Sequence, residues 1–445
     1  MGFWGPHGHD GIWHLGLIEA IKKGIPPQNP AFAGDKLINY HYFYDLLLAQ
    51  TSLLTKIESV DLYFRFFPIL IALSLGGVVY ILAKNWFKSN ITALLSVFFV
   101  YFGGSFGWIL VFFKDKSLGG ETAFWAQQSV STLINPPFAI SLLIFLAGLY
   151  LFHKIIGQKD QIIPLIIPMV ILWGMLIEFK AYGGILVLGA LSIVSLIEIL
   201  KRNLSFLIVS VPILLLSLLV FLPNNSMSGS LLIFSPFWLI HSMIDSPDRV
   251  GWFRLQLARM AGEESGNWFK FIAAEGIGLM LFLIGNLGTR IVGILSFKSF
   301  WPINSFNLFL LSFLSLATIL PLTFIQKGAN FNTVQFFYYF LLVFNFLAGA
   351  SCILLIKRFK IFGIILVIIL IIATIPTTLS TLSHYLPIRP PARISNAELE
   401  ALNFLKSQPD GTVLSYYYDK YLKEQFSEPI PLFAYESTMY LSALT

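Results

Sequence analysis

Charged residues and cysteines are scarce in this chain of 445 residues. Asp, Glu, Lys and Arg together make up 12% of it, whereas about 25% is usual for a soluble domain. This shortage, together with a hydrophobic content of 56%, excludes an ordinary soluble protein and an intrinsically disordered one. The single cysteine, Cys352, has no partner for an internal disulfide, so cysteine usage does not indicate a redox compartment.

Motifs for nucleotide and zinc chemistry are also missing. The sequence has no Walker A loop, no glycine-rich dinucleotide fingerprint and no HExxH. A nucleotide-sugar or ATP site is therefore unsupported. The net charge of +6 would suggest nucleic acid in a soluble protein, but basic loops on one face of a membrane explain it better here. We therefore expect membrane lipid, and no nucleic acid, as a partner.

Long apolar runs dominate the sequence. Runs of about 20 apolar residues are typical of spanning helices, and they predict an all-α polytopic membrane protein with about ten transmembrane helices. Glycines at 103, 104 and 107 interrupt the second run, which predicts a helix end near Phe102. The predicted spans are 66–83, 91–112, 137–153, 162–178, 182–200, 204–222, 269–288, 305–325, 334–356 and 361–381.

Basic residues divide the loops between these spans into two sets. The positive-inside rule places the richer set in the cytoplasm. The long loops 103–136 and 223–268 then lie outside, as do both termini. The chain is thus predicted to be a multi-pass protein of the cytoplasmic (inner) membrane with an extracytoplasmic active site. The cytoplasmic set is Lys84, Lys88, Lys154, Lys159, Lys201, Arg202, Arg290, Lys298, Lys357, Arg358 and Lys360.

Residues 1–65 are predicted to form a first extracytoplasmic loop ahead of the transmembrane domain, 66–383. Ile12–Lys22 and Tyr40–Leu54 are apolar on one side but too short to span, which predicts helices lying on the membrane surface. This loop carries no signal peptide of its own. A first transmembrane helix is therefore expected to precede Met1.

Residues 384–445 are more polar than the rest, and they predict the start of a small extracytoplasmic α/β domain, which is expected to be incomplete in this chain. Ser395 and Glu398 form a capping box, which predicts a helix to about Lys406. Thr412–Tyr418 is predicted to be a strand.

Histidines and aspartates gather in the first loop. Asp10 and His14 share one helix face if a helix starts at Asp10, which is also a good N-cap residue. One interpretation is a cap with interface histidines. The other is a catalytic cluster of Asp10, His14 and His9, with Asp10 as general base or, together with His14, as ligand of a divalent cation. Beyond this candidate cation the cofactor stays unknown.

Three basic residues at outer positions form a second candidate group: Arg249, Lys180 and Arg65. Contact with lipid headgroups, or snorkelling from a helix end, is the simpler interpretation. The alternative is that these residues bind the phosphate of a lipid-linked substrate that enters from the bilayer.

The order of these features resembles the GT-C fold membrane glycosyltransferases that use polyprenyl-phosphate sugars, a family that includes the protein O-mannosyltransferases. The resemblance rests on three segments: His9-Asp10-Gly11-Ile12-Trp13-His14, Tyr40-His41-Tyr42-Phe43-Tyr44-Asp45-Leu46-Leu47-Leu48-Ala49 and Phe64-Arg65-Phe66-Phe67-Pro68. The family often has a second acidic residue in the first of these motifs, where this chain has Gly11.

The resemblance implies a hexosyl- or pentosyltransferase that moves a sugar from a polyprenyl phosphate to a hydroxyl acceptor on a glycan, lipid or protein, with inversion at the anomeric carbon. Asp10 is then the base, and Arg249, Lys180 or Arg65 holds the donor phosphate. The loop 103–136 is expected to form the acceptor cleft with Glu121, Trp125, Gln127 and Asn135.

Two other classes stay open. A transporter or flippase predicts ionisable residues inside the spans and inverted repeats. A non-catalytic assembly protein of the cell envelope predicts nothing special about Asp10.

Overall fold

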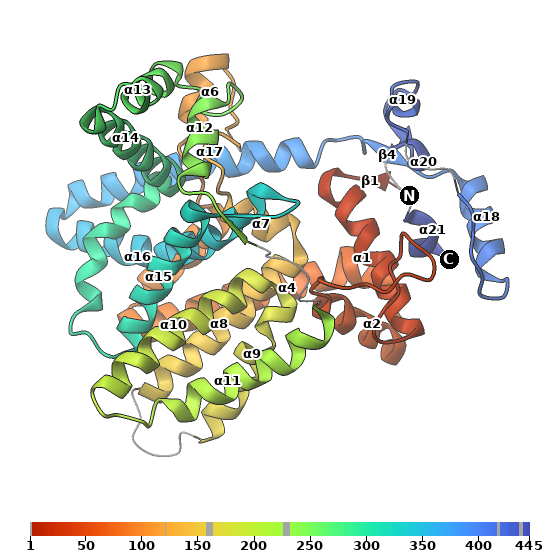
Figure 1. Ribbon diagram of the computed structural model, residues 1–445, viewed down its shortest axis with the longest axis horizontal. Coiled ribbons are helices and arrows are strands. Elements are labelled where there is room, and N and C mark those ends of the chain that lie inside the picture. The colour runs from red at the N-terminus through yellow and green to blue at the C-terminus, as the bar shows by residue number, and fades with distance from the viewer. Residues whose placement is uncertain (1, 121, 157–162, 226–231, 416–418, 436–438) are drawn as a thin grey trace.

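The structure is a computed structural model that describes residues 2–120, 122–156, 163–225, 232–415, 419–435 and 439–445, without the side chains of residues 5–9 and 420. Long helices form a bundle on one side of the molecule (Figure 1). A smaller layer, built from both ends of the chain, lies on the other side. The long helices of the bundle are α4 (Phe67–Phe87), α5 (Asn90–Phe102), α8 (Pro136–Ile156), α9 (Ile163–Phe179), α10 (Ala181–Leu200), α11 (Leu207–Phe221), α14 (Trp268–Leu287), α15 (Ser305–Thr323), α16 (Val334–Phe359) and α17 (Ile361–Tyr385).

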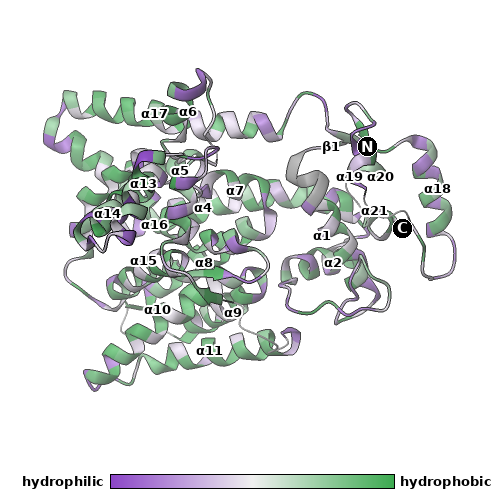
Figure 2. Cartoon of the chain, turned by 45° about the horizontal axis from the view of Figure 1, so that its top comes forward, coloured by the Kyte–Doolittle hydropathy of each residue, from purple (hydrophilic) through white to green (hydrophobic). Residues whose placement is uncertain are grey.

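All ten predicted spans are helical, and the predicted all-α polytopic fold is confirmed. Within the described ranges, eight helices are long and apolar enough to cross a membrane, and the bent pair α5 and α6 (Gly107–Asp115) makes a ninth. The remaining predicted span, α9, is an apolar helix of 17 residues. Apolar residues cover these helices on most sides (Figure 2). Only 17% of the 18 residues from Leu207 to Asn224, which include α11, are buried in the protein, as expected of a helix that faces lipid.

Shorter elements connect the long helices. A π-helical turn, η1 (Leu62–Phe66), follows α3 (Ser59–Asp61) and leads into α4. Strands β2 (Leu232–Phe234) and β3 (Phe324–Gln326) pair antiparallel. The others are α7 (Gln128–Ile134), η2 (Leu222–Asn224), α12 (Trp238–Asp245), α13 (Phe253–Glu264), η3 (Gly288–Phe300) and η4 (Asn330–Thr333).

The predicted break in the second span is present, since α5 ends at Phe102 and α6 starts at Gly107 with a bend of 45°. Close backbone packing explains the glycines here. Gly288, at the end of α14, has a φ of 55°, and a Cβ there would lie 2.4 Å from the carbonyl oxygen of Gly104. Only glycine combines that conformation with such a short approach.

Arg290 is fully buried, so its predicted place in a basic cytoplasmic loop is wrong. The chain does not leave the bundle after α14 but continues into the 3₁₀ helix η3. The Arg290 guanidinium donates to the carbonyl oxygens of Leu287 at 2.9 Å, Asn286 at 2.6 Å and Gly104 at 3.4 Å. These are carbonyls at helix ends, which lack intrahelical partners and attract positive charge.

The smaller layer joins the first loop to the C-terminal segment. Strand β1 (Gly2–Phe3) pairs antiparallel with β4 (Ala392–Arg393), which pairs parallel with β5 (Ile430–Pro431). Helix α1 (Gly5–Lys23) lies beside α21 (Tyr440–Leu444) and α2 (Phe43–Thr55), as Figure 1 shows. Helices α18 (Asn396–Lys406), α19 (Lys420–Lys423) and α20 (Leu432–Tyr435) complete the layer.

The C-terminal predictions have mixed outcomes. The Ser395 hydroxyl accepts from the backbone N–H of Glu398 at 3.1 Å, so the predicted cap of α18 is confirmed. The predicted strand at Thr412–Tyr418 is wrong for 412–415, while 416–418 lie outside the described residues. Residues 2–3, 392–393 and 430–431 form the sheet instead. Leu414 is 99% exposed, so this stretch has no surface on which to bury an apolar face.

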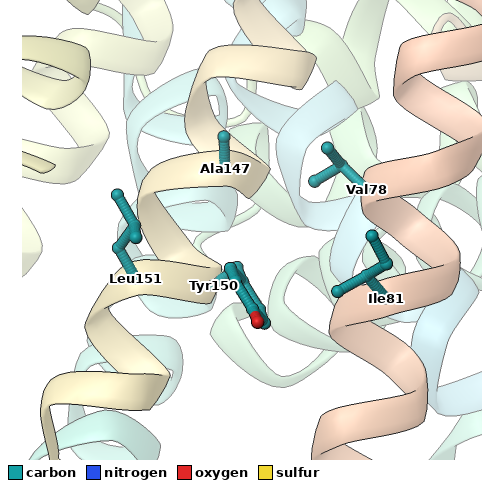
Figure 3. Close-up of a pocket in the computed structure, with 5 residues that line it drawn as sticks. All are labelled: Val78, Ile81, Ala147, Tyr150 and Leu151. Carbon is teal, nitrogen blue, oxygen red and sulfur yellow. The ribbon is translucent and has the colours of Figure 1, made fainter. Parts of the chain in front are cut away.

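The α4–α8 seam contains an apolar hollow of about 260 Å³ (Figure 3). Its walls are Val78 and Ile81 of α4 and Ala147, Tyr150 and Leu151 of α8. A second hollow of about 50 Å³ lies further along the seam, between Pro68 and Pro136. None of the predicted site residues lines either hollow.

Candidate active site

Helix α1 carries Asp10 and His14 one turn apart, and it forms the inner wall of the candidate site. Trp4 is its N-cap residue and Pro6 stands in its first turn, where proline is favoured because its missing N–H is not needed. Asp10 therefore lies inside the helix, and its predicted role as N-cap is wrong. Its carboxylate is exposed. His9 also lies in α1, but its side chain is outside the described part of the chain.

His14 points into the protein, toward α2. Its Nδ1 lies 2.9 Å from Oδ1 of Asp45, and the two residues are 7% and 0% exposed. The imidazole stacks on Tyr63 with a centroid separation of 5.6 Å and meets the edge of Tyr44 at 6.4 Å. Burial raises the pKa of Asp45, and the neighbouring His14 acts in the opposite direction. A site role for His14 was predicted from the sequence, but its pairing with Asp45 was not.

Lys180 reaches the same place from the bundle. It is the single residue between α9 and α10 and is 7% exposed. Its backbone N–H donates to the carbonyl oxygen of Leu176 at 2.9 Å, whereas its amine makes no hydrogen bond or ion pair with another residue that the structure describes. Burial lowers the pKa of its amine to about 8, and the charge of Asp10 acts against this shift. Asp10 is thus close enough for its charge to act on the amine.

Two aromatic residues of the first loop complete this corner. The rings of Tyr40 and His41 stack at 5.0 Å, and Tyr40 meets the edge of Trp13 at 5.6 Å. Burial raises the pKa of Tyr40, and Asp45 and Asp10 add to the shift. Burial lowers the pKa of His41 well below its usual value, and the positive charges of Lys180 and His14 act in the same direction.

Glu178 is a further buried acid that the sequence analysis did not single out. It lies in the last turn of α9, two residues before Lys180, and is 1% exposed. Its Oε2 has no hydrogen-bond partner among the described residues. A glutamate at the end of a long apolar run was the available signal.

The other two predicted phosphate ligands are engaged elsewhere. Arg65 is an exposed residue of η1 and donates to Asp61 at 2.6 Å. Arg249 lies between α12 and α13, where it donates to the carbonyl oxygen of Thr122 at 2.7 Å and sits 3.3 Å above the Trp125 ring. In Figure 1, α12 and α13 are at the upper left, whereas α1 is on the right. The structure therefore groups Lys180, but not Arg249, with Asp10.

The predicted acceptor-cleft residues are spread along one loop. Glu121 lies outside the described residues. The Trp125 indole donates to the Ser242 hydroxyl at 2.9 Å and stacks on Phe331. Gln127 is the N-cap residue of α7, and Asn135 accepts from the backbone N–H of Phe138 at 3.1 Å at the start of α8. Trp125 and Asn135 thus have structural contacts of their own, and a cleft that contains them stays a prediction.

A metal ion has limited support from this geometry. The parts of the chain that the structure describes contain no group of three His, Cys, Asp or Glu side chains placed to hold one. The Nδ1 of His14 is directed at Asp45, which leaves Nε2 as its remaining ligand atom. A site of Asp10 and His14 needs further ligands, and the cation stays a prediction.

No family model and no curated protein sequence matches the chain. Among solved structures, it is similar to the archaeal oligosaccharyltransferase AglB from Archaeoglobus fulgidus, in complex with an inhibitory peptide and a dolichol-phosphate. The similarity has a TM-score of 0.52 at 13% identity, and it covers 92% of this chain. It covers 55% of the archaeal chain, so this chain spans little more than half its length. The chain thus shares the fold of this protein, in agreement with the GT-C fold that its sequence predicted.

Proposed function

We propose that the protein is a glycosyltransferase that moves a sugar from a polyprenyl phosphate to a hydroxyl acceptor at the outer face of the cytoplasmic membrane. The observation that carries this proposal is that the exposed Asp10 lies close enough for its charge to act on the buried amine of Lys180. The dolichol-phosphate in the archaeal oligosaccharyltransferase of the same fold supports a lipid-phosphate donor.

The proposed reaction is a single displacement. Asp10 takes the proton of the acceptor hydroxyl while the acceptor oxygen attacks the anomeric carbon of the donor sugar. The bond from that carbon to the phosphate oxygen breaks, and the polyprenyl phosphate leaves with the electron pair. The Lys180 ammonium interacts with the negative charge of that phosphate. Attack opposite to the leaving group gives inversion. The alternative role of Asp10, as ligand of a divalent cation together with His14, is a separate proposal, in which the cation would neutralise the charge of the leaving phosphate.

The transporter alternative predicted ionisable residues inside the spans, and the described helices contain several buried ones, among them Glu178 of α9, Glu198 of α10 and Glu275 of α14. Glu198 accepts from the amide of Asn203 at 2.9 Å, and the Oε1 of Glu275 lies 2.7 Å from Nε2 of His241. Arg290, which follows α14, donates to helix-end carbonyls. These three side chains thus have structural partners within the protein. A direct assay separates the classes: the protein in nanodiscs, given a panel of polyprenyl-phosphate sugars, should release polyprenyl phosphate only when a hydroxyl acceptor is present. If no donor in the panel releases polyprenyl phosphate with any glycan, lipid or protein acceptor, the proposal is refuted.

We expect Lys180→Met to raise the KM for the donor by about tenfold with little change in kcat, because an ammonium–phosphate contact exists before and during transfer. The amine is charged below its pKa of about 8 and neutral above it. In the wild type, donor affinity should therefore fall as the pH rises through 8, and Lys180→Arg should remove that dependence. Initial rates over a donor series at several pH values give both quantities. Lys327→Met, at an exposed lysine, is the matched control; equal KM values for the two variants would contradict the assignment.

The orientation of the protein gives a second prediction. Cysteines at Ser117 and Ser407, both exposed, should react with an impermeant thiol reagent in whole cells, whereas one at Asn203 should react only after lysis. The native Cys352 is buried and serves as background. Labelling of the Asn203 variant in intact cells would reverse the topology and place the Asp10 side of the molecule in the cytoplasm.

A further inference from the structure

Asp45 is the fully buried carboxyl group of a helix whose other buried residues are mostly apolar. It belongs to α2, where Tyr44, Leu48 and Ala49 are buried with it. Its Oδ1 lies 2.9 Å from Nδ1 of His14, and its Oδ2 has no partner among the described residues. A buried carboxyl with one free oxygen is costly, so this arrangement is a poor source of stability.

The contacts that follow Asp10 in helix α1 fix that part of the helix. Gly11 packs against Phe64 so closely that a Cβ would lie 2.9 Å from its ring. One turn after Asp10, His14 is held by Asp45, stacks on the face of Tyr63 and meets the edge of Tyr44. Because a helix is rigid over one turn, these contacts set the direction in which α1 presents Asp10.

An apolar pair of the same volume would hold two helices together at least as well as a buried acid and imidazole. What the polar pair adds is direction, since a hydrogen bond at 2.9 Å fixes one rotation of the helix and one orientation of the ring. We propose that Asp45 is a positioning residue: through His14 it holds α1 in the rotation that presents Asp10 beside Lys180. This inference rests on the proposed role of Asp10 as base, and Asp45 itself is too deeply buried to touch substrate.

Two substitutions that keep the branched shape of the side chain separate positioning from simple packing. Asp45→Asn keeps an oxygen that accepts from Nδ1–H of His14, and we expect its kcat within about threefold of the wild type. Asp45→Leu fills the space without an acceptor, and we expect its kcat to fall about 10- to 100-fold, as a misplaced catalytic group does. The donor KM should change less than about twofold in both, because Lys180 is untouched. All rates are expressed per folded molecule, measured by size-exclusion chromatography.

A cross-linking measurement tests the same geometry without any turnover. In a Cys352→Ser background, Asp10→Cys and Lys180→Cys should be joined by a short bifunctional thiol reagent. Asp45→Leu should slow this reaction several-fold, and Asp45→Asn should leave it unchanged. A second pair, Glu19→Cys with Ser59→Cys, reports whether α1 stays docked, because these side chains lie 2.6 Å apart near its other end. That pair should react equally in all variants.

The inference fails if Asp45→Leu keeps the wild-type kcat and the cross-link between positions 10 and 180. It also fails if Asp45→Leu loses this cross-link together with the one between positions 19 and 59, because α1 would then be undocked rather than rotated. Unchanged kcat per folded molecule with a lower yield of protein would show that Asp45 only supports folding. Failure of the proposed function has a different signature. Wild-type protein would transfer no sugar, while the dependence of the 10–180 cross-link on Asp45 would still be measurable.

Discussion

Asp10→Asn should lower sugar transfer by about 100-fold or more, because an amide cannot take the proton of the acceptor hydroxyl. The substitution keeps the size of the side chain. Asp10 is exposed in the interior of α1 and does not cap the helix, so loss of the charge should leave folding nearly unchanged. Single-turnover transfer from a radiolabelled polyprenyl-phosphate sugar measures the chemical step directly. The fall should appear in kcat and in kcat/KM together.

Asp35→Asn is the matched control, since Asp35 is another exposed aspartate of the first loop, with its Oδ2 3.4 Å from the amide of Asn29. We expect this variant to transfer sugar at the wild-type rate. Undiminished transfer by Asp10→Asn would remove the central claim. Asp248 and Glu121, which belong to the two long loops, would then be the next residues to test as the base.

The elements that sequence reasoning located well are those decided locally. A long apolar run must be helical in lipid, because no other conformation satisfies its backbone there. The end of α5 at Phe102 followed from three glycines, and the start of α18 followed from Ser395. Helix α1 begins at Gly5, seven residues before its predicted start at Ile12. Pro6 favours this early start, because proline is well tolerated in the first turn of a helix.

The site depends on contacts between distant parts of the chain, which local patterns do not specify. His14 and Asp45 are 31 residues apart, and Lys180 comes from the bundle. Asp45 did carry a local signal, because an acid on the buried face of an apolar helix needs a partner. Nothing local distinguishes Lys180 from Arg249, since both follow apolar segments at an outer position. Only the fold shows that Arg249 contacts Trp125 instead.

Arg249 and Trp125 also show how the two long loops relate. The guanidinium stacks on the indole and donates to Thr122, while the Lys114 amine donates to the carbonyl oxygens of Arg249 and Val250 at 2.9 Å. The loops 103–136 and 223–268 are thus bound to each other. A change in one of them is therefore expected to move the other, and the proposed acceptor residues belong to this joint unit rather than to the Asp10 corner.

The largest effect on stability is expected at Arg290, which sequence reasoning had placed in a loop. Its guanidinium donates to three carbonyl oxygens at the end of α14 and beyond the end of α5, in a part of the bundle from which water is excluded. Arg290→Leu leaves these oxygens without donors, and each unsatisfied carbonyl in such surroundings costs several kcal/mol. Part of this cost is offset, because the variant no longer buries a charged group. We expect a net loss of about 3–5 kcal/mol in the free energy of unfolding. Thermal unfolding in detergent, followed by size-exclusion chromatography, measures this loss.

Lys298→Leu, at an exposed lysine of the same helix η3, is the control and should change the free energy of unfolding by no more than about 0.5 kcal/mol. If the two variants unfold at the same temperature, the guanidinium does not hold the two helix ends together, and the packing of glycines 103, 104 and 288 alone must do so.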